Sequence, residues 1–184
     1  MNKYGEILEN GDLKFERLLP GPIERVWSWI ADGDKRAKWL CGGGDAHSEG
    51  SISFDFKHQN LTPHDDPFPD KYKEMETGIS FEIVVTKVDP PHHMVWYWPT
   101  DFGANSEIEI TLKEEGDQVR LILIQRGYDT VEDLTGSSGG WHTHLDIMVD
   151  KLNRKRPEAF WDKHERLAQE YAIRFADVIK TLGQ

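Results

Sequence analysis

The eight histidines are the side chains of this sequence best suited to proton transfer or metal binding, but their spacing does not group them. His142 and His144 lie two residues apart in a segment expected to be helical, so their side chains point in nearly opposite directions and cannot share one ion. His92 and His93 are adjacent in a turn, and His164 falls in an apolar helical stripe, where a packing role is expected. We therefore expect no metal and no other cofactor.

Residues for nucleophilic or acid–base catalysis are also not evident. Cys41 is the only thiol, and the sequence around it matches no nucleophile motif. The glycine run at 42–44 could bind an anion through backbone N–H groups, but it lacks the Lys-Ser or Lys-Thr of a P-loop. Asp101 or Glu82 could act as a general base only if it faced a cavity. We assign no catalytic residue and favour a binding protein over an enzyme.

The seven tryptophans indicate binding of a small apolar molecule instead. Trp39, Trp96, Trp98 and Trp141 fall on positions expected to face inward. Aromatic walls with a few polar anchors are typical of small-molecule pockets. The alternative is that these indoles only fill the core. For the group we favour a pocket, because every buried indole N–H needs a hydrogen-bond partner.

Two polar residues share the inward faces of expected strands. Gln125 could anchor a ligand, or it could lie at a strand end and meet solvent. Arg17 stands on the apolar face of the first expected strand, and a buried guanidinium needs a partner. A structural salt bridge is the favoured interpretation for Arg17, and a ligand carboxylate is the alternative.

The elements that must position these side chains are predicted by hydrophobic periodicity. Alternation of apolar and polar residues predicts strands over 12–19, 51–57, 79–88, 94–98, 106–114 and 118–126. Between the first two, a helix led by Pro22 shows apolar residues at helical spacing, and a second short helix or turn is expected over 35–40. The glycine run at 42–44 is expected to be a flexible loop.

The second half of the chain is predicted to be largely helical. A polar loop over 129–140 leads to a helix with Ser138 as its N-cap and an apolar stripe that includes Trp141. A break at 154–157 precedes a last helix over 158–182. Residues 58–77 hold no convincing periodicity and predict a long loop with at most one helical turn, which could serve as a lid.

Strands followed by helices argue for an α+β fold, in which one helix packs on one face of an antiparallel sheet. The length of 184 residues fits one domain. We expect a core of about residues 12–155, an insert loop at 58–77 and a C-terminal helical extension at 156–184.

Charge and composition limit the partners. The net charge is -11, carried by the first 150 residues, and such a body repels phosphate backbones, so we expect no nucleic-acid partner. The chain has no apolar run long enough for a membrane span and no hydrophobic signal core at its start. A single cysteine excludes an internal disulfide and favours a reducing, cytoplasmic setting.

Three segments carry a resemblance to a known family. The stretch "PIERVWSWIAD" resembles the opening of the START-like (SRPBCC) superfamily, "VTKVDPPHHMVWYW" its strand–turn–strand unit, and "SSGGWHTHLDIMVDKL" the start of its C-terminal helix. The chain is most similar to the branch named after the activator of the heat-shock-protein-90 ATPase, over about residues 12–155. The resemblance implies a helix-grip fold, in which a curved sheet of six or seven strands wraps a long helix and leaves a cavity. The insert and the extra C-terminal helix depart from the short bacterial pattern and could cover or fill that cavity.

Function is left open among three hypotheses, because this fold hosts many activities. The leading one is binding of a small hydrophobic or aromatic ligand between sheet and helix. The alternatives are a chaperone-linked interaction module and a cyclase-like or hydrolytic enzyme. Monomer and homodimer are both compatible with the sequence. The residues expected to line the cavity are Trp39, Phe54, Phe56, Phe81, Trp96, Trp98, Ile110, Leu121, Gln125, Trp141, Leu145 and Met148.

Overall fold

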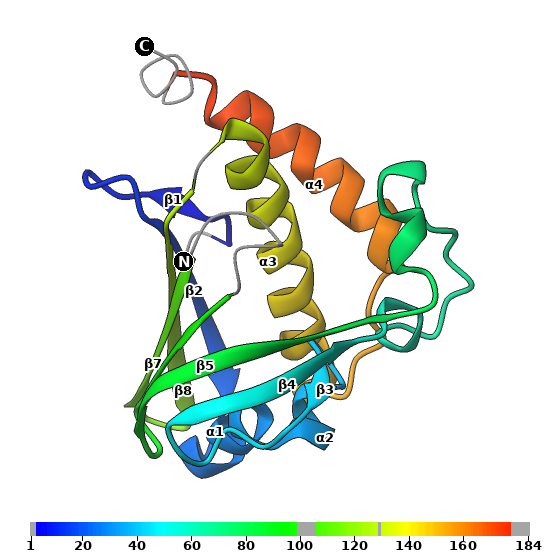
Figure 1. Ribbon diagram of the computed structural model, residues 1–184. Helices are drawn as coiled ribbons and strands as arrows, with labels where there is room; N and C mark the ends of the chain where they lie inside the picture. Colours follow the sequence, from blue (N-terminus) through cyan, green and yellow to red (C-terminus); the bar gives the residue numbers. More distant parts are fainter. Residues whose placement is uncertain (1–2, 99–105, 129, 178–184) are drawn as a thin grey trace.

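A computed structural model describes residues 3–98, 106–128 and 130–177 of the chain. Eight strands form one antiparallel sheet in the order β1-β2-β8-β7-β6-β5-β4-β3. Their bounds are β1 (Glu6–Ile7), β2 (Leu13–Pro20), β3 (Gly42–Gly43), β4 (Gly50–Phe56), β5 (Ile79–Asp89), β6 (His93–Tyr97), β7 (Glu107–Glu115) and β8 (Gln118–Arg126). The sheet curves around helix α3 (Val131–Leu152), and helix α4 (Phe160–Arg174) lies against α3 on the side away from β2 and β8 (Figure 1). This is the expected α+β helix-grip fold.

Alternation places one face of the sheet in the core. In β2, Leu13, Phe15, Arg17 and Leu19 are buried while the residues between them are partly exposed. The register pairs Arg17 with Leu121 of β8 and Leu13 with Gln125, so inward positions on neighbouring strands meet on the same face. An irregularity in the β5–β6 pairing between Val85 and Lys87 marks a bulge, which bends the sheet locally.

The count of eight strands corrects the expectation of six or seven. The two additional strands, β1 and β3, lie at the edges of the sheet and are two residues long. A two-residue strand shows no alternation, so periodicity does not detect it. The six strands predicted from alternation all form, with ends shifted by no more than one residue.

The glycine run at 42–44 is part of the packed structure, which corrects the expectation of a flexible loop. Helix α1 (Ile23–Ala31) is followed by the short helix α2 (Gly33–Arg36), and Arg36 is fully buried. Its guanidinium donates hydrogen bonds to the carbonyl oxygens of Gly42 and Gly44 and stacks over the Phe54 ring at 4.4 Å. These bonds tie the glycine backbone to α2, because a buried guanidinium requires acceptors.

Helix α3 begins at Val131, within the segment 129–140 that was expected to be a loop. Thr130 is its N-cap, with Oγ1 accepting a hydrogen bond from the backbone N–H of Asp133 at 3.1 Å. Ser138, expected as the N-cap, is buried inside the helix and donates to the carbonyl oxygen of Leu134 at 2.6 Å. The segment expected to be a loop is helical because packing against α4 outweighs the low helix propensity of its serines and glycines.

The insert and the C-terminal extension meet on the open side of the fold. The insert contains two short 3-10 helices, η1 (His58–Asn60) and η2 (Asp70–Met75). Figure 1 shows this insert beside the first turns of α4. The Trp161 backbone N–H donates to the Asp66 carboxylate at 2.5 Å, and the Tyr72 and Trp161 rings stack with centroids 4.9 Å apart. Of the last helix expected over 158–182, the portion Phe160–Arg174 is helical, and residues 178–184 lie outside the described part of the chain.

Candidate functional site

A cavity of about 360 Å³ lies between the sheet, the insert and the two long helices. Such a volume is within the usual range for small-molecule sites. It reaches the surface, because the lining residues Lys71 and Glu132 are exposed. Its lining comprises Leu40, Phe56, His58, Lys71, Tyr72, Met75, Ile79, Phe81, Trp98, Ser106, Gln125, Gly127, Tyr128, Glu132, Asp133, Gly136, Ser137, Gly140, Trp141, His144 and His164.

Aromatic rings from three elements form the apolar wall. Phe56 of β4 and Phe81 of β5 are diagonal neighbours across the strand pair and stack with ring centroids 5.6 Å apart. Trp98 directly follows β6, and its ring centroid lies 5.7 Å from that of Phe81 and 6.1 Å from that of Trp141 in α3. Rings held in mutual contact present flat apolar surfaces at little cost in side-chain entropy, which suits the binding of another ring.

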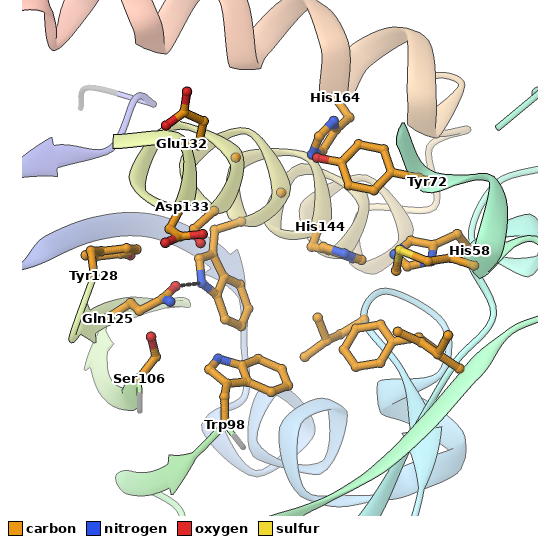
Figure 2. A pocket seen from close by; sticks show the side chains of 18 of the residues that line it. His58, Tyr72, Trp98, Ser106, Gln125, Tyr128, Glu132, Asp133, His144 and His164 are labelled. Atoms are coloured by element: carbon orange, nitrogen blue, oxygen red, sulfur yellow. Dashed lines mark hydrogen bonds between the residues drawn. The ribbon is translucent and has the colours of Figure 1, made fainter. Parts of the chain in front are cut away.

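Trp141 and Gln125 are fixed to each other. The Trp141 indole N–H donates to the Gln125 side-chain oxygen at 2.5 Å, shown as the dashed line in Figure 2. Gln125 is only 5% exposed, so it does not meet solvent as one interpretation of the sequence allowed. This hydrogen bond satisfies the indole and sets the orientation of both side chains at the cavity wall.

A polar group of residues surrounds the first turn of α3. Glu132, Asp133, Tyr128, Gln125 and Ser106 lie together on one side of the site in Figure 2. The Asp133 carboxylate accepts a hydrogen bond from the Thr130 hydroxyl at 2.6 Å. The Tyr128 hydroxyl is buried and has no hydrogen-bond partner in the part of the chain that the structure describes. Burial raises the pKa of Tyr128 well above the ordinary value.

Three histidines form the opposite side of the site. His58 comes from η1, His144 from α3 and His164 from α4, and all three pack around Phe160. Figure 2 shows His58, His144 and His164 on the side away from Tyr128. Nδ1 of His144 donates to the Trp39 carbonyl oxygen at 2.7 Å, whereas Nδ1 of His58 and of His164 have no hydrogen-bond partner within the described residues.

Burial keeps these three imidazoles neutral. It lowers the pKa of His58 and of His164 to about 4, with the positive charge of Lys71 adding to the effect on His164. Burial lowers the pKa of His144 to about 3, and a hydrogen bond to the Trp39 carbonyl opposes this only in part. Among the described residues, no group of three or more His, Cys, Asp or Glu is arranged to hold a metal ion.

The structure brings together five of the twelve residues expected at the site. Phe56, Phe81, Trp98, Gln125 and Trp141 line the cavity. The other seven are buried in the core outside its lining: Trp39, Phe54, Trp96, Ile110, Leu121, Leu145 and Met148. Trp39 is fully buried, and its indole N–H donates to the Trp29 carbonyl oxygen at 2.7 Å.

Other candidate residues are placed away from the cavity. Arg17 forms a salt bridge with Asp146 of α3 at 3.0 Å, as its favoured interpretation held. Glu82 is exposed on the outer face of β5, and Asp101 lies outside the described residues. Cys41 is buried, and burial raises the pKa of its thiol to about 12, which keeps the thiol protonated and a poor nucleophile.

Sequence reasoning missed the histidine side of the site. His58, Lys71, Tyr72 and Met75 belong to the insert, and His164 belongs to the helical extension. The sequence did show that these two parts could cover the cavity, but no pattern within either part relates it to the sheet. Contacts between segments about a hundred residues apart in the sequence are set by tertiary packing, which local periodicity does not report.

Comparison with known proteins shows which family this chain belongs to. A family model described as Activator of Hsp90 ATPase homolog 1-like protein matches residues 20–153, which is most of the chain. The chain belongs to this family. No curated protein matches it.

Solved structures show the same fold. The protein encoded by gene BPP1335 from Bordetella parapertussis is 36% identical, with a TM-score of 0.77 over 91% of this chain and 88% of that one. CalU16 from Micromonospora echinospora is 18% identical, with a TM-score of 0.63 over 96% and 95% of the two chains. The Aha1 dimer from Colwellia psychrerythraea is 16% identical, with a TM-score of 0.56 over 77% and 95%. The last two likenesses show the fold alone.

In the part of this chain that the structure describes, no helix is long and apolar enough to cross a membrane.

Proposed function

We propose that this protein binds a small molecule with an aromatic or otherwise apolar body in the cavity between the sheet, α3 and α4. The observation that carries the proposal is an unfilled volume of about 360 Å³ walled by Phe56, Phe81, Trp98 and Trp141. An open cavity of this volume with aromatic walls and a few polar groups is typical of small-molecule sites. The expected ligand class follows from the wall, because flat rings bind flat apolar molecules by burial and stacking.

The polar atoms at the two sides of the cavity favour the interpretation as a ligand site over that of a packing defect. Buried polar groups in native proteins are almost always hydrogen-bonded. Nδ1 of His58, Nδ1 of His164 and the Tyr128 hydroxyl are buried and have no hydrogen-bond partner among the described residues, and all three side chains line the cavity. A ligand with polar groups at both ends and an apolar body between them would satisfy these atoms, which a purely hydrocarbon ligand would not.

Two measurements test the binding itself. Native mass spectrometry of the freshly purified protein should show a small adduct that is lost on denaturation, and the same spectrum would distinguish monomer from homodimer. Titration with naphthalene-1-acetamide, a neutral two-ring probe, should change the fluorescence of the cavity tryptophans Trp98 and Trp141 in a saturable way.

A pair of variants at one position provides the control. Gly140 lines the cavity, and a Cβ added there would meet no atom within 4 Å. Gly140→Phe should fill the volume and weaken probe binding at least tenfold, whereas Gly140→Ala should leave binding within about twofold and add helix propensity of about 1 kcal/mol. Equal binding by the two variants would place the probe outside this cavity and overturn the proposal.

A further inference from the structure

The histidine side of the cavity has hydrogen-bonding capacity that the protein does not use. His58 is 7% exposed and His164 is 6% exposed, and both side chains line the cavity. Nδ1 of each ring is buried and has no hydrogen-bond partner among residues 3–98, 106–128 and 130–177, although the His164 ring also forms a hydrogen bond with the Gly136 backbone. The third histidine, His144, has Nδ1 engaged with the Trp39 carbonyl, so the open capacity belongs to the first two rings.

The charges facing these rings have one sign. Lys71 of η2 lines the cavity and acts on His164 from the insert. Tyr72 of η2 contacts His164 edge-on, with centroids 5.3 Å apart, and supplies a hydroxyl. From α3 the facing titratable group is His144, and from η1 it is His58 itself.

No carboxylate of the described residues compensates these groups at that side. The acidic residues of the lining are Glu132 and Asp133, both in the first turn of α3. Neither carboxylate is among the groups that shift the pKa of His58 or His164, and in Figure 2 both lie on the Tyr128 side, away from His58 and His144. The Asp66 carboxylate of the insert is engaged by the Trp161 backbone N–H. The cavity therefore has a basic side, an aromatic middle and an acidic side.

We propose that the ligand is an aromatic carboxylic acid, held with its carboxylate against His58 and His164 and its ring system between Trp98, Phe81 and Trp141. This assignment rests on the proposed function and specifies its ligand class. A carboxylate offers several acceptor sites on two oxygens, which suits two imidazole N–H donors and the Tyr72 hydroxyl. A cationic ligand group would be repelled by Lys71 at this side.

Binding of such an acid is coupled to proton uptake. In the free protein both imidazoles are neutral, because burial disfavours their charged forms. An anion placed beside them favours the charged form. One proton from the solvent therefore adds to one imidazole as the carboxylate enters, and the product is a buried imidazolium–carboxylate pair with no covalent bond made or broken.

The test compares two probes of equal shape. Naphthalene-1-acetic acid and naphthalene-1-acetamide are titrated into the full chain by calorimetry at pH 5.5, 6.5 and 7.5, each in two buffers with different ionisation enthalpies. The acid should bind at least tenfold more tightly than the amide at pH 6.5. Its binding should take up close to one proton, and its affinity should fall as the pH rises from 6.5 to 7.5, whereas the amide should show neither effect.

Variants separate the histidines from the fold. The double variant His58→Phe with His164→Phe keeps a ring at both places and should remove the proton uptake and the preference for the acid, with both probes measured on the same variant. His47→Phe is the matched control, since His47 is exposed on the surface beside Asp32 and outside the cavity. It should behave like the parent, and thermal unfolding should show that all variants are folded.

The outcomes distinguish this inference from the binding function beneath it. Equal binding of acid and amide, or acid binding without proton uptake, would overturn the carboxylate assignment and leave the cavity as a site for neutral aromatic molecules. Binding of neither probe to the parent protein, with Gly140→Phe indistinguishable from Gly140→Ala, would overturn both.

Discussion

At the scale of single residues, Asp146 of α3 shows how a partly buried charge organises this fold. Arg17 of β2 lies 3.0 Å from its carboxylate, Lys163 of α4 lies 2.8 Å away, and His142 approaches to 3.4 Å. Burial alone would raise the pKa of Asp146, but the hydrogen bonds from His142 and Lys163 and the charge of Arg17 hold it far below its ordinary value. One carboxylate thus joins the sheet to both long helices.

Replacing this carboxylate should be costly. Asp146→Asn removes the carboxylate that neutralises the buried Arg17 and leaves the buried Lys163 with only Glu158 of the described residues, 3.6 Å away. Removal of one partner from a buried ion pair destabilises by roughly 3 kcal/mol or more, and chemical denaturation should show that loss in the free energy of unfolding. Asp150→Asn, one helical turn away, is the control. Burial raises the pKa of Asp150, so the neutral amide should be tolerated there. Equal losses at the two positions would contradict the central role of Asp146.

At the scale of elements, the glycines of α3 have different tasks although two of them are adjacent. A Cβ at Gly139 would lie 3.2 Å from the His164 carbonyl oxygen and 3.2 Å from the Ala168 backbone nitrogen, so the two helix backbones meet at this position. A Cβ at Gly140 would project into open space at the cavity wall. The missing side chain allows close helix packing in one case and leaves cavity volume in the other.

Alanine substitution at each position should separate these tasks. Both changes gain helix propensity of about 1 kcal/mol. At Gly139 the new methyl group presses on the backbone of α4, which yields less readily than a side chain. We expect Gly140→Ala to raise the melting temperature of the protein. Gly139→Ala should melt at a lower temperature than Gly140→Ala, and the free energies of unfolding of the two variants should differ by roughly 1–2 kcal/mol. If the two variants melt together, the close helix contact does not control the packing of α4.

These elements also show what the sequence could predict. Alternation placed all six longer strands, because one face of each is buried against the same core and leaves a period of two. The first turns of α3 were expected to be a loop, since Gly136, Ser138 and Gly139 carry loop propensities that contact with α4 overrides. The same alternation predicted four of the residues that line the cavity, namely Phe56, Phe81, Trp98 and Gln125. The histidines did not, because their meeting depends on how the insert and α4 dock.

At the scale of the whole molecule, the cavity belongs to the parts that lie around the family core as much as to the core itself. The family model ends at residue 153, so His164 and the whole of α4 lie beyond it. The sheet and α3 supply the aromatic wall, while the insert and α4 supply the basic side. A family frame of this kind fixes the shape of the site, and the added segments determine the chemistry that it offers.

The same histidines should make the stability of the whole protein depend on pH. Their pKa is about 6.5 in an unfolded chain, against about 4 for His58 and His164 and about 3 for His144 in the folded protein. Between these values the unfolded chain binds more protons, so folding stability is full above pH 6.5 and falls as the pH drops. The pKa of His142 is lowered too, by burial, and acts in the same direction.

The expected loss between pH 7 and pH 5 is on the order of 2 kcal/mol for each of the three cavity histidines, measurable as a shift of the urea midpoint. Asp146 does not contribute in this window, because its lowered pKa affects stability only as the pH falls below the ordinary aspartate range. His164→Phe should flatten the pH dependence by the share of one histidine. A urea midpoint that stays constant from pH 7 to pH 5 in the parent protein would contradict this prediction. It would mean that the buried imidazoles accept protons in the folded state, so that the histidines are already positively charged before a carboxylic acid ligand binds.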